Sequence, residues 1–155
     1  MHHTFKAQVN WTINEGGSTN NPRTFSRNHK VTIANKASDL QVSAAKPFRG
    51  DESLLNPEDL LLSALTSCHM MSYLYVCAQH QIEVLSYTDT SEGDLEVGSN
   101  GCGSFKRVRL KPIVTIKDGS KKDLALSLHA KANKLCFIAN SCNFTISHEA
   151  TIVVG

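Results

Sequence analysis

Hydrophobic and polar residues alternate along the N-terminal third of the chain. The stretch FKAQVNWTI (residues 5–13) has a period of two, which is typical of a β-strand. The same alternation returns at about residues 26–34 and in LQVSAA (residues 40–45). The segment 14–23 is rich in Gly, Asn and Pro and predicts a loop. We therefore expect three strands in an antiparallel meander.

A long apolar stretch, LLNPEDLLLSALTSCHMMSYLYVCAQH (residues 54–80), follows these strands. Asn56 is a favourable N-cap, and Pro57 suits the first helical position. Glu58 and Asp59 lie where the helix dipole favours negative charge. These signals predict a helix from residue 57 to about residue 79. Its apolar residues run almost all the way round, so we expect it in the protein interior.

The C-terminal half combines strand and helix patterns. Residues 82–97 alternate like a strand with a turn in it, and a glycine-rich turn precedes a strand at about 104–117. A helix is predicted near 121–135, and a turn and a final strand follow, the strand at about 147–154. The apolar stripe of this second helix consists of Leu124, Leu128, Ala132 and Leu135. Because no repeat or linker is visible, we expect residues 1–155 to form one α+β domain.

Composition and charge narrow the classes of protein to which the chain can belong. With 155 residues and 17.0 kDa, it is long enough to bury a core as one domain. The net charge is +2 and the Lys and Arg residues are scattered, so no nucleic-acid partner is expected. No uninterrupted run of about 18 apolar residues occurs, so no membrane span is expected. The start, MHHTFKAQVNW, has no apolar signal-peptide region, which predicts a cytoplasmic protein.

Sulfur chemistry is the next possibility that the composition raises. The five cysteines are Cys68, Cys77, Cys102, Cys136 and Cys142. An odd number in a reducing compartment predicts free thiols rather than a disulfide framework. The six-residue gaps that separate Cys136, Cys142 and His148 do not match a zinc module, and no C-x-x-C pair is present. We therefore expect no metal site and no cofactor.

Cys68 lies in the middle of the long predicted helix, in LTSCHMM. The simplest interpretation is a buried core thiol, because free cysteine is among the most buried residue types. However, polar residues surround it on both sides in the sequence, and Cys136 at the end of the second helix could meet it. Two thiols that meet in a reducing compartment favour redox cycling.

Two further residues of the long helix are candidates for a role beside Cys68. Glu58 precedes Cys68 by ten residues and could hold an arginine over the thiol, although it could also merely complement the helix dipole. A cation near Cys68 would lower the pKa of its thiol. His69 could act as a base, but neighbouring helical residues point about 100° apart. The candidate arginines are Arg23, Arg27 and Arg49.

Two separated motifs, NPEDLLLSALTSCHMMSYL and LCFIANSCNFTISHE, resemble the OsmC/Ohr family of osmotically inducible and organic hydroperoxide resistance proteins. In both the chain and the family, a cysteine follows the glutamate of N-P-E by ten residues, and a second cysteine follows the second helix. The order of elements is similar over nearly the whole chain. The resemblance implies an α+β fold with antiparallel sheets around a long buried central helix. It also implies an intertwined homodimer with active sites at the subunit interface.

The same resemblance implies a thiol peroxidase. Cys68 would attack an organic hydroperoxide and become a sulfenic acid, and Cys136 would resolve it as a disulfide. A dithiol such as a lipoyl group would then restore both thiols. Glu58 would hold an arginine over the Cys68 thiolate. We prefer Arg27 to Arg23 for this role because it directly precedes the strand HKVTI.

The chain departs from the hydroperoxide resistance proteins at two positions. Phe137 follows the second cysteine, where those proteins have proline, and His69 replaces their usual aromatic residue. Two other functions therefore stay open: a non-catalytic dimer that binds a small hydrophobic ligand, and acyl transfer or hydrolysis with Cys68 as nucleophile and His69 as base. Whether Cys142 serves as an alternative resolving thiol also stays open.

Overall fold

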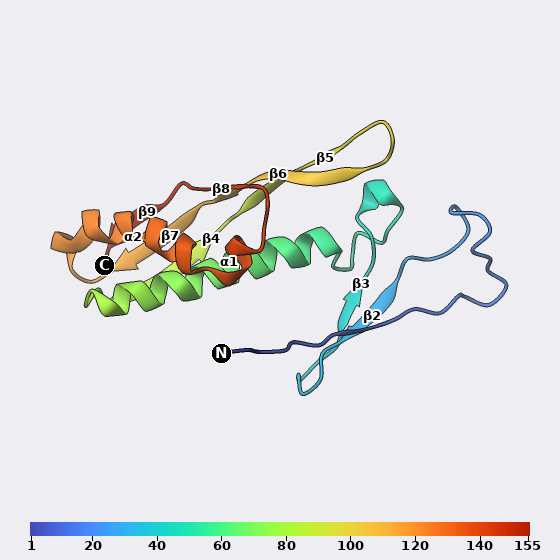
Figure 1. The fold of residues 1–155 in the computed structure, drawn as a ribbon, viewed down its shortest axis with the longest axis horizontal. Coiled ribbons are helices and arrows are strands. Elements are labelled where there is room, and N and C mark those ends of the chain that lie inside the picture. The colour runs from blue at the N-terminus through green and yellow to red at the C-terminus, as the bar shows by residue number, and fades with distance from the viewer. The chain divides into compact units, whose positions relative to one another are not determined.

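The computed structural model describes all residues from 1 to 155 (Figure 1). It divides into two units, Met1–Leu61 and Leu62–Gly155, and each is described by itself. The boundary falls inside the long helix α1 (Pro57–Gln79). The sequence-based expectation of a mixture of strands and helices is confirmed, and the fold is α+β.

The first unit contains a small antiparallel sheet. Its strands, in the order β1-β2-β3, are β1 (Gln8–Asn10), β2 (His29–Thr32) and β3 (Leu40–Val42). The predicted meander is confirmed, with shorter strands, because β2 pairs with each neighbour over only three positions. A 3-10 helix, η1 (Lys46–Phe48), follows the sheet. Only Val42 and Ser43 of this unit are buried.

Helix α1 begins where its capping residues predict. The backbone N–H of Asp59 donates to Asn56 Oδ1 at 2.8 Å, and the backbone N–H of Asn56 donates to Asp59 Oδ2 at 3.2 Å. This reciprocal pair satisfies two backbone donors that the helix itself leaves free. Both predicted ends of the helix, at residues 57 and 79, are confirmed.

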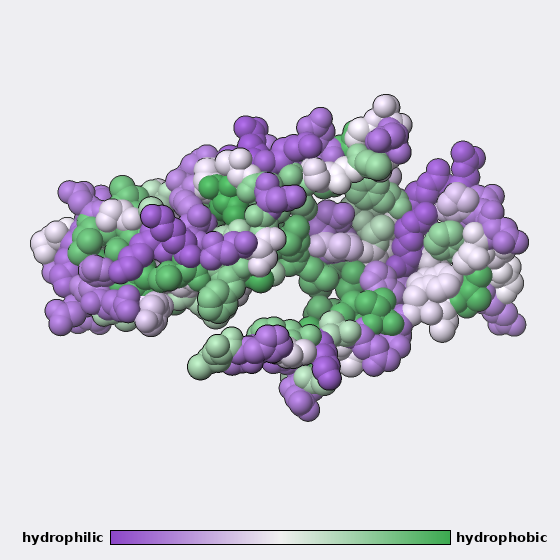
Figure 2. Space-filling model, viewed as in Figure 1, coloured by the Kyte–Doolittle hydropathy of each residue, from purple (hydrophilic) through white to green (hydrophobic).

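The chain buries only one side of α1. The buried side chains form a single stripe: Leu65, His69, Tyr73, Val76 and Cys77. On the opposite side, Met71 and Tyr75 are 58% and 59% exposed. Figure 2 shows hydrophobic surface along the stretch where α1 runs. The expectation of an interior helix therefore holds for one face of α1 within a single chain.

By length and composition alone, α1 would also suit a membrane span. The core helices of soluble proteins satisfy the same criterion, so it carries little weight for a single helix.

The second unit contains two three-stranded sheets. One has the order β4-β7-β9, with β4 (Val84–Asp89), β7 (Pro112–Ile116) and β9 (Thr151–Val154). The other has the order β5-β6-β8, with β5 (Glu92–Val97), β6 (Gly103–Leu110) and β8 (Thr145–His148). In each sheet the first pair is antiparallel and the second pair is parallel. The β5–β6 hairpin is the long yellow arm in Figure 1.

Two stretches predicted as single strands, at about 104–117 and 147–154, are each divided between the two sheets, which corrects the sequence analysis. Residues 82–97, predicted as a strand with a turn in it, are divided in the same way. The strands are interrupted near residues 90, 111 and 149, and hydrogen bonds link the residues at these three interruptions to one another. Asp89 Oδ1 accepts from the backbone N–H of Lys111 at 2.8 Å and from Ser91 Oγ at 2.8 Å. The backbone N–H of Glu149 donates to the Leu110 carbonyl at 2.8 Å. The alternation of residues continues through the breaks near residues 111 and 149, so periodicity could not reveal these two.

Two helices complete the second unit. A 3-10 turn, η2 (Gly119–Lys121), leads into α2 (Lys122–Leu135), and the short α3 (Phe137–Asn140) follows. The predicted second helix is confirmed, but its buried stripe is only partly correct. Its buried residues are Ala125, Leu128, His129 and Ala132, whereas Leu124 and Leu135 are exposed.

The core of the second unit joins α1 to α2 and to both sheets. One cluster consists of Tyr73, Val76, Cys77, Ile82, Val114, Ile116, Ala125, Leu128, Ala132 and Ile152. The other consists of Leu65, Val108, Leu110, Cys136 and Ala139. The buried Tyr73 hydroxyl donates to the Ala125 carbonyl at 3.0 Å and so links α1 directly to α2.

Loss of this hydroxyl should weaken the fold. Tyr73→Phe removes the only side-chain partner of the Ala125 carbonyl, and we expect the free energy of unfolding to fall by about 1 kcal/mol. Urea denaturation measures this change. Tyr75→Phe is the matched control because its hydroxyl is exposed and bonds only Gln79. Equal losses in the two variants would contradict a stabilising role for the Tyr73 hydrogen bond.

Candidate functional site

The structure brings Cys68 and Cys136 together. Cys68, half-buried on α1, packs against the core cluster that contains Cys136, whose exposed fraction is 0%. Cys68 lies close enough to Cys136 to contribute to the raised pKa of the Cys136 thiol. All five cysteines are free thiols. The two thiols are therefore neighbours in the structure, and the assignment of roles to them stays a prediction.

Local backbone structure fixes the position of Cys136. The residue ends α2 and begins α3, with an extended backbone between the two helices. Its Sγ accepts a hydrogen bond from the backbone N–H of Ala139 at 3.3 Å. Burial, and then the hydrogen bond with Cys68, raises the pKa of Cys136 to about 11. At neutral pH this side chain is therefore a protonated thiol.

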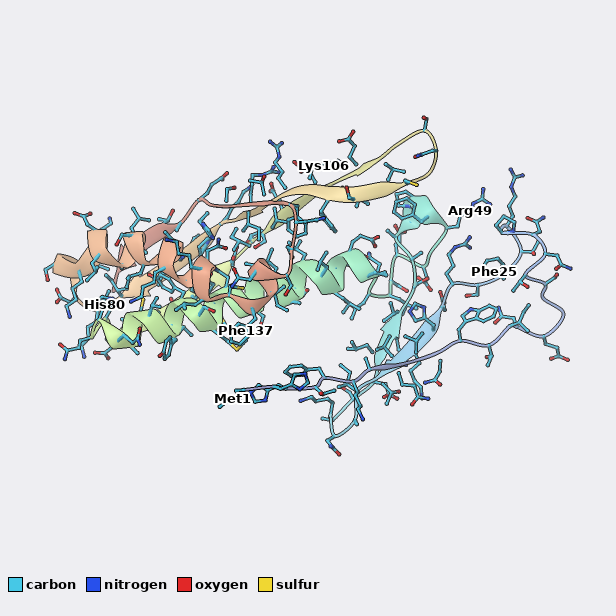
Figure 3. All side chains as sticks on the ribbon, in the orientation of Figure 1. Met1, Phe25, Arg49, His80, Lys106 and Phe137 are labelled. Carbon is cyan, nitrogen blue, oxygen red and sulfur yellow. The ribbon has the colours of Figure 1, made fainter.

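Cys68 lines an apolar cavity of about 320 Å³. The other residues in the lining are Met71, Ser72, Tyr75, Leu135 and Phe137. Phe137, labelled in Figure 3, begins α3 beside α1 and is 82% exposed, so it forms an open edge of the cavity. Cys136 does not belong to the lining. A small apolar molecule in this cavity would meet Cys68 and not Cys136.

Glu58 lies in the first turn of α1, where the sequence predicted it. Its side chain is half-buried, and the buried Oε2 atom accepts no hydrogen bond. A buried carboxylate oxygen without a donor is costly to the folded state. The position is thus suited to a cationic partner.

The structure does not bring Arg27 to Glu58. The guanidinium donates to the Pro22 carbonyl at 2.9 Å and to the Phe25 carbonyl at 3.4 Å. It also lies over the Phe25 ring, 4.9 Å from its centroid. The alternative, Arg23, is exposed. The assignment of an arginine to Glu58 stays a prediction.

Three histidines form a cluster that the sequence analysis did not predict. His69 on α1, His129 on α2 and His148 on β8 stack with ring planes within 25° of parallel. His69 Nε2 lies 3.1 Å from His129 Nδ1, and the Tyr73 ring stacks on His129 at 3.9 Å. His129 lies in the predicted second helix and His148 in the predicted final strand, so their spacing in the sequence gave no sign that the two side chains meet.

Burial decides the protonation of this cluster. It lowers the pKa of His69 to about 3 and the pKa of His129 to about 4, and the other histidines add to the effect. Both side chains are therefore neutral at neutral pH. No group of three His, Cys, Asp or Glu side chains is arranged to hold a metal ion. The near-parallel rings agree with this, because ligands of one ion converge on it.

His69 does not support the alternative of a thiol hydrolase. Its ring is completely buried and bonded to His129, and it is not part of the cavity lining around Cys68. A base for Cys68 needs hydrogen-bond reach of the thiol or of a bound substrate. The structure directs His69 into the core instead.

Comparisons with known proteins agree with this fold. Residues 50–151 match the family model described as OsmC-like protein. The uncharacterized protein YmaD of Bacillus subtilis is 26% identical, and the match covers 99% of this chain and 97% of that protein.

Solved structures extend the similarity to the whole fold. An OsmC-like protein of unknown function from Vibrio cholerae is 29% identical with a TM-score of 0.85, over 97% of this chain and 100% of that one. An organic hydroperoxide resistance protein from Legionella pneumophila is 18% identical with a TM-score of 0.72, over 97% of each chain. At this lower identity the likeness concerns the fold alone.

The histidine cluster should make the fold sensitive to acid. The folded state holds the pKa of His129, about 4, below its ordinary value of 6.5, so the unfolded chain binds more protons between these values. Stability is complete above about pH 6.5 and declines as the pH falls toward 4, by on the order of 2 kcal/mol for His129. Urea unfolding across this range measures the loss.

A variant without this titration is the control for acid sensitivity. His129→Asn retains a polar group near Nδ1 but carries no titrating side chain. Its stability should fall less over the same pH range than that of the unmodified protein. Parallel curves for the two proteins would show that His129 does not cause the acid sensitivity.

Proposed function

The chain belongs to the OsmC-like protein family, and from this premise we propose that it is a thiol-dependent peroxidase that reduces organic hydroperoxides. The observation that carries the proposal is the contact between Cys68, which lines an apolar cavity, and Cys136, which lies behind it in the core. A protein that only binds a hydrophobic ligand has no need of this pair. The organic hydroperoxide resistance proteins from Legionella pneumophila and Bacillus subtilis share the fold.

The first step uses the thiol that lines the cavity. The Cys68 thiolate attacks the terminal peroxide oxygen, the O–O bond breaks, and the alkoxide takes a proton and leaves as an alcohol. Cys68 becomes a sulfenic acid. The cavity supports this assignment because its apolar lining suits the organic part of the substrate, and it exposes Cys68 rather than Cys136.

The second step uses the buried thiol. The Cys136 sulfur attacks the Cys68 sulfenic acid, and a disulfide and one water molecule form as the S–O bond breaks. The contact between the side chains supports this step, since no solvent-exposed thiol is needed. When a dithiol reductant, such as a lipoyl group, reopens the disulfide, the Ala139 N–H is in place to stabilise the Cys136 sulfur.

Glu58 and Arg27 complete the proposed site. The arginine would keep Cys68 in its thiolate form, and Glu58 would hold the arginine in place. The unpartnered Oε2 of Glu58 supports this role, because a guanidinium supplies the donor that it lacks. Arg27 now bonds only backbone carbonyls, so it would exchange those bonds for the carboxylate.

We also infer that the chain acts as a homodimer. The open face of α1, including Met71 and Tyr75, supports this inference, because large apolar side chains on a core helix favour coverage by a second copy. Both residues also line the Cys68 cavity. A second copy on this face would therefore adjoin the site and exclude water from it.

Peroxide consumption tests the proposed function directly. The reduced protein should consume cumene hydroperoxide faster than hydrogen peroxide in a stopped-flow assay, because the cavity is apolar. Cys68→Ser should remove the reaction. Without added reductant, Cys136→Ser should consume one equivalent and stop at the sulfenic acid, whereas Cys142→Ser, the matched control, should consume one equivalent and end with the Cys68–Cys136 disulfide, as the unmodified protein does. Consumption no faster than that of a free thiol would reject the peroxidase and leave a non-catalytic protein that binds a small hydrophobic ligand.

The arginine assignment has its own test. Arg27→Ala should lower the rate constant with cumene hydroperoxide by about a hundredfold, because a thiolate without its cation is less populated. Circular dichroism should show an intact fold. Arg23→Ala is the control and should keep its activity. Full activity of Arg27→Ala, or a loss only in Arg23→Ala, would show that the assignment is wrong.

A further inference from the structure

We propose that His69 and His129 are positioning residues, whose hydrogen bond between α1 and α2 holds Cys136 in register with Cys68 for disulfide formation. This inference rests on the proposed function, since it concerns the same two thiols. It assigns a role to a histidine pair that lines no cavity near Cys68 and that the proposed chemistry does not use.

The chain places the histidine pair beside the thiol pair. His69 directly follows Cys68 on α1, and His129 precedes Cys136 by seven residues, about two turns of α2. The His69 Nε2 to His129 Nδ1 distance of 3.1 Å therefore joins the two helices that carry the reacting sulfurs. Tyr73 provides the other buried hydrogen bond between these helices, to Ala125, and both residues lie four positions further from the cysteines than the two histidines do.

Disulfide formation makes strict demands on the separation of two helices. The Cα atoms must lie about 4.4 to 6.8 Å apart, and larger distances require the backbone to move. Cys136 is tied to the end of α2 and the start of α3, so a shift of α2 against α1 moves its sulfur directly. A hydrogen bond restricts the position of α2 along α1 more tightly than apolar contact does, because a hydrogen bond requires a defined distance and angle.

The cost of the cluster also argues for a role beyond packing. Three of its ring nitrogens, His69 Nδ1, His129 Nε2 and His148 Nε2, are buried without a hydrogen-bond partner. Leucine or phenylalanine side chains would fill comparable space without burying polar atoms. His69 and His129, at 0% and 3% exposure, therefore gain their value from the single directed bond between them.

The surroundings keep this bond intact at neutral pH. Tyr73, Tyr87 and Asp89 face the cluster together with His148, and burial keeps both bonded imidazoles neutral. One neutral ring donates its N–H and the other accepts it. The pair thus forms one complete hydrogen bond inside the core.

Equilibration with glutathione tests the inference without any peroxide. One glutathione disulfide takes two electrons from Cys68 and Cys136, which gives the protein disulfide and two glutathione thiols. The equilibrium constant measures how well the fold positions the two sulfurs. His129→Leu should lower it about tenfold, the equivalent of one buried hydrogen bond, and His129→Asn should retain it within about threefold, since its amide lies near the position of Nδ1.

Tyr73→Phe is the control matched for stability. It also removes one buried hydrogen bond between α1 and α2, but Ala125 lies further from Cys136 than His129 does. Its equilibrium constant should stay near that of the unmodified protein. If His129→Leu does not fold, His69→Leu breaks the same bond from the other helix. The inference would be overturned if the equilibrium constant fell equally in His129→Leu, His129→Asn and Tyr73→Phe. It would also be overturned if a folded His129→Leu or His69→Leu protein showed no fall.

The experiment separates this inference from the proposed function. A protein that forms the Cys68–Cys136 disulfide with glutathione but consumes no hydroperoxide would reject the peroxidase, and the variant series would still decide the histidine role. Absence of the disulfide at all glutathione ratios, established by mass spectrometry of the digested protein, would overturn the inference itself.

Discussion

The packing of one stripe of α1 against α2 is the interaction on which the second unit depends. Leu65, His69 and Tyr73 lie on this stripe, and they reach both of the core clusters and the buried histidines. The chain passes from one sheet to the other near residues 90, 111 and 149, and residues of both sheets pack against the same stripe. Because the two cysteines belong to these two helices, the geometry of the thiol pair follows from the packing of the helices.

Unequal burial gives the two thiols different chemical characters. Cys68 reaches an apolar cavity, whereas Cys136 is enclosed and keeps its proton at neutral pH because burial raises its pKa. A small molecule that enters the cavity would therefore contact the Cys68 sulfur and not the Cys136 sulfur. This asymmetry is the physical basis for assigning different roles to residues of the same type.

The same helix has two further faces with different consequences. On its histidine side, α1 buries a ring nitrogen of His69 that has no hydrogen-bond partner, which is unfavourable for the folded state. On its outer side, Met71 and Tyr75 are exposed. Both features are unfavourable for an isolated chain, and both lie next to the thiols. Membership of the OsmC-like family accounts for the fold.

Much of the local structure was determined by the sequence alone. The cap formed by Asn56 and Asp59 defined the start of α1, and alternation located the strands of the first sheet. The spacing of Glu58, Cys68 and Cys136 pointed to the family and to the thiol pair. These features depend on interactions between near neighbours, or on motifs that the chain itself displays.

Only the tertiary structure decided which segments meet. Long-range pairing divided two continuous strand patterns between two sheets, and Asp89 and Glu149 bond backbone groups far away in the sequence at these breaks. The histidine cluster joins residues from α1, α2 and β8 that no periodicity relates. Arg27 bonds the carbonyls of Pro22 and Phe25 rather than Glu58. The position of Arg27 before a predicted strand gave no information about these partners. Periodicity reports which face of an element is apolar, but the partner of that face depends on the whole chain.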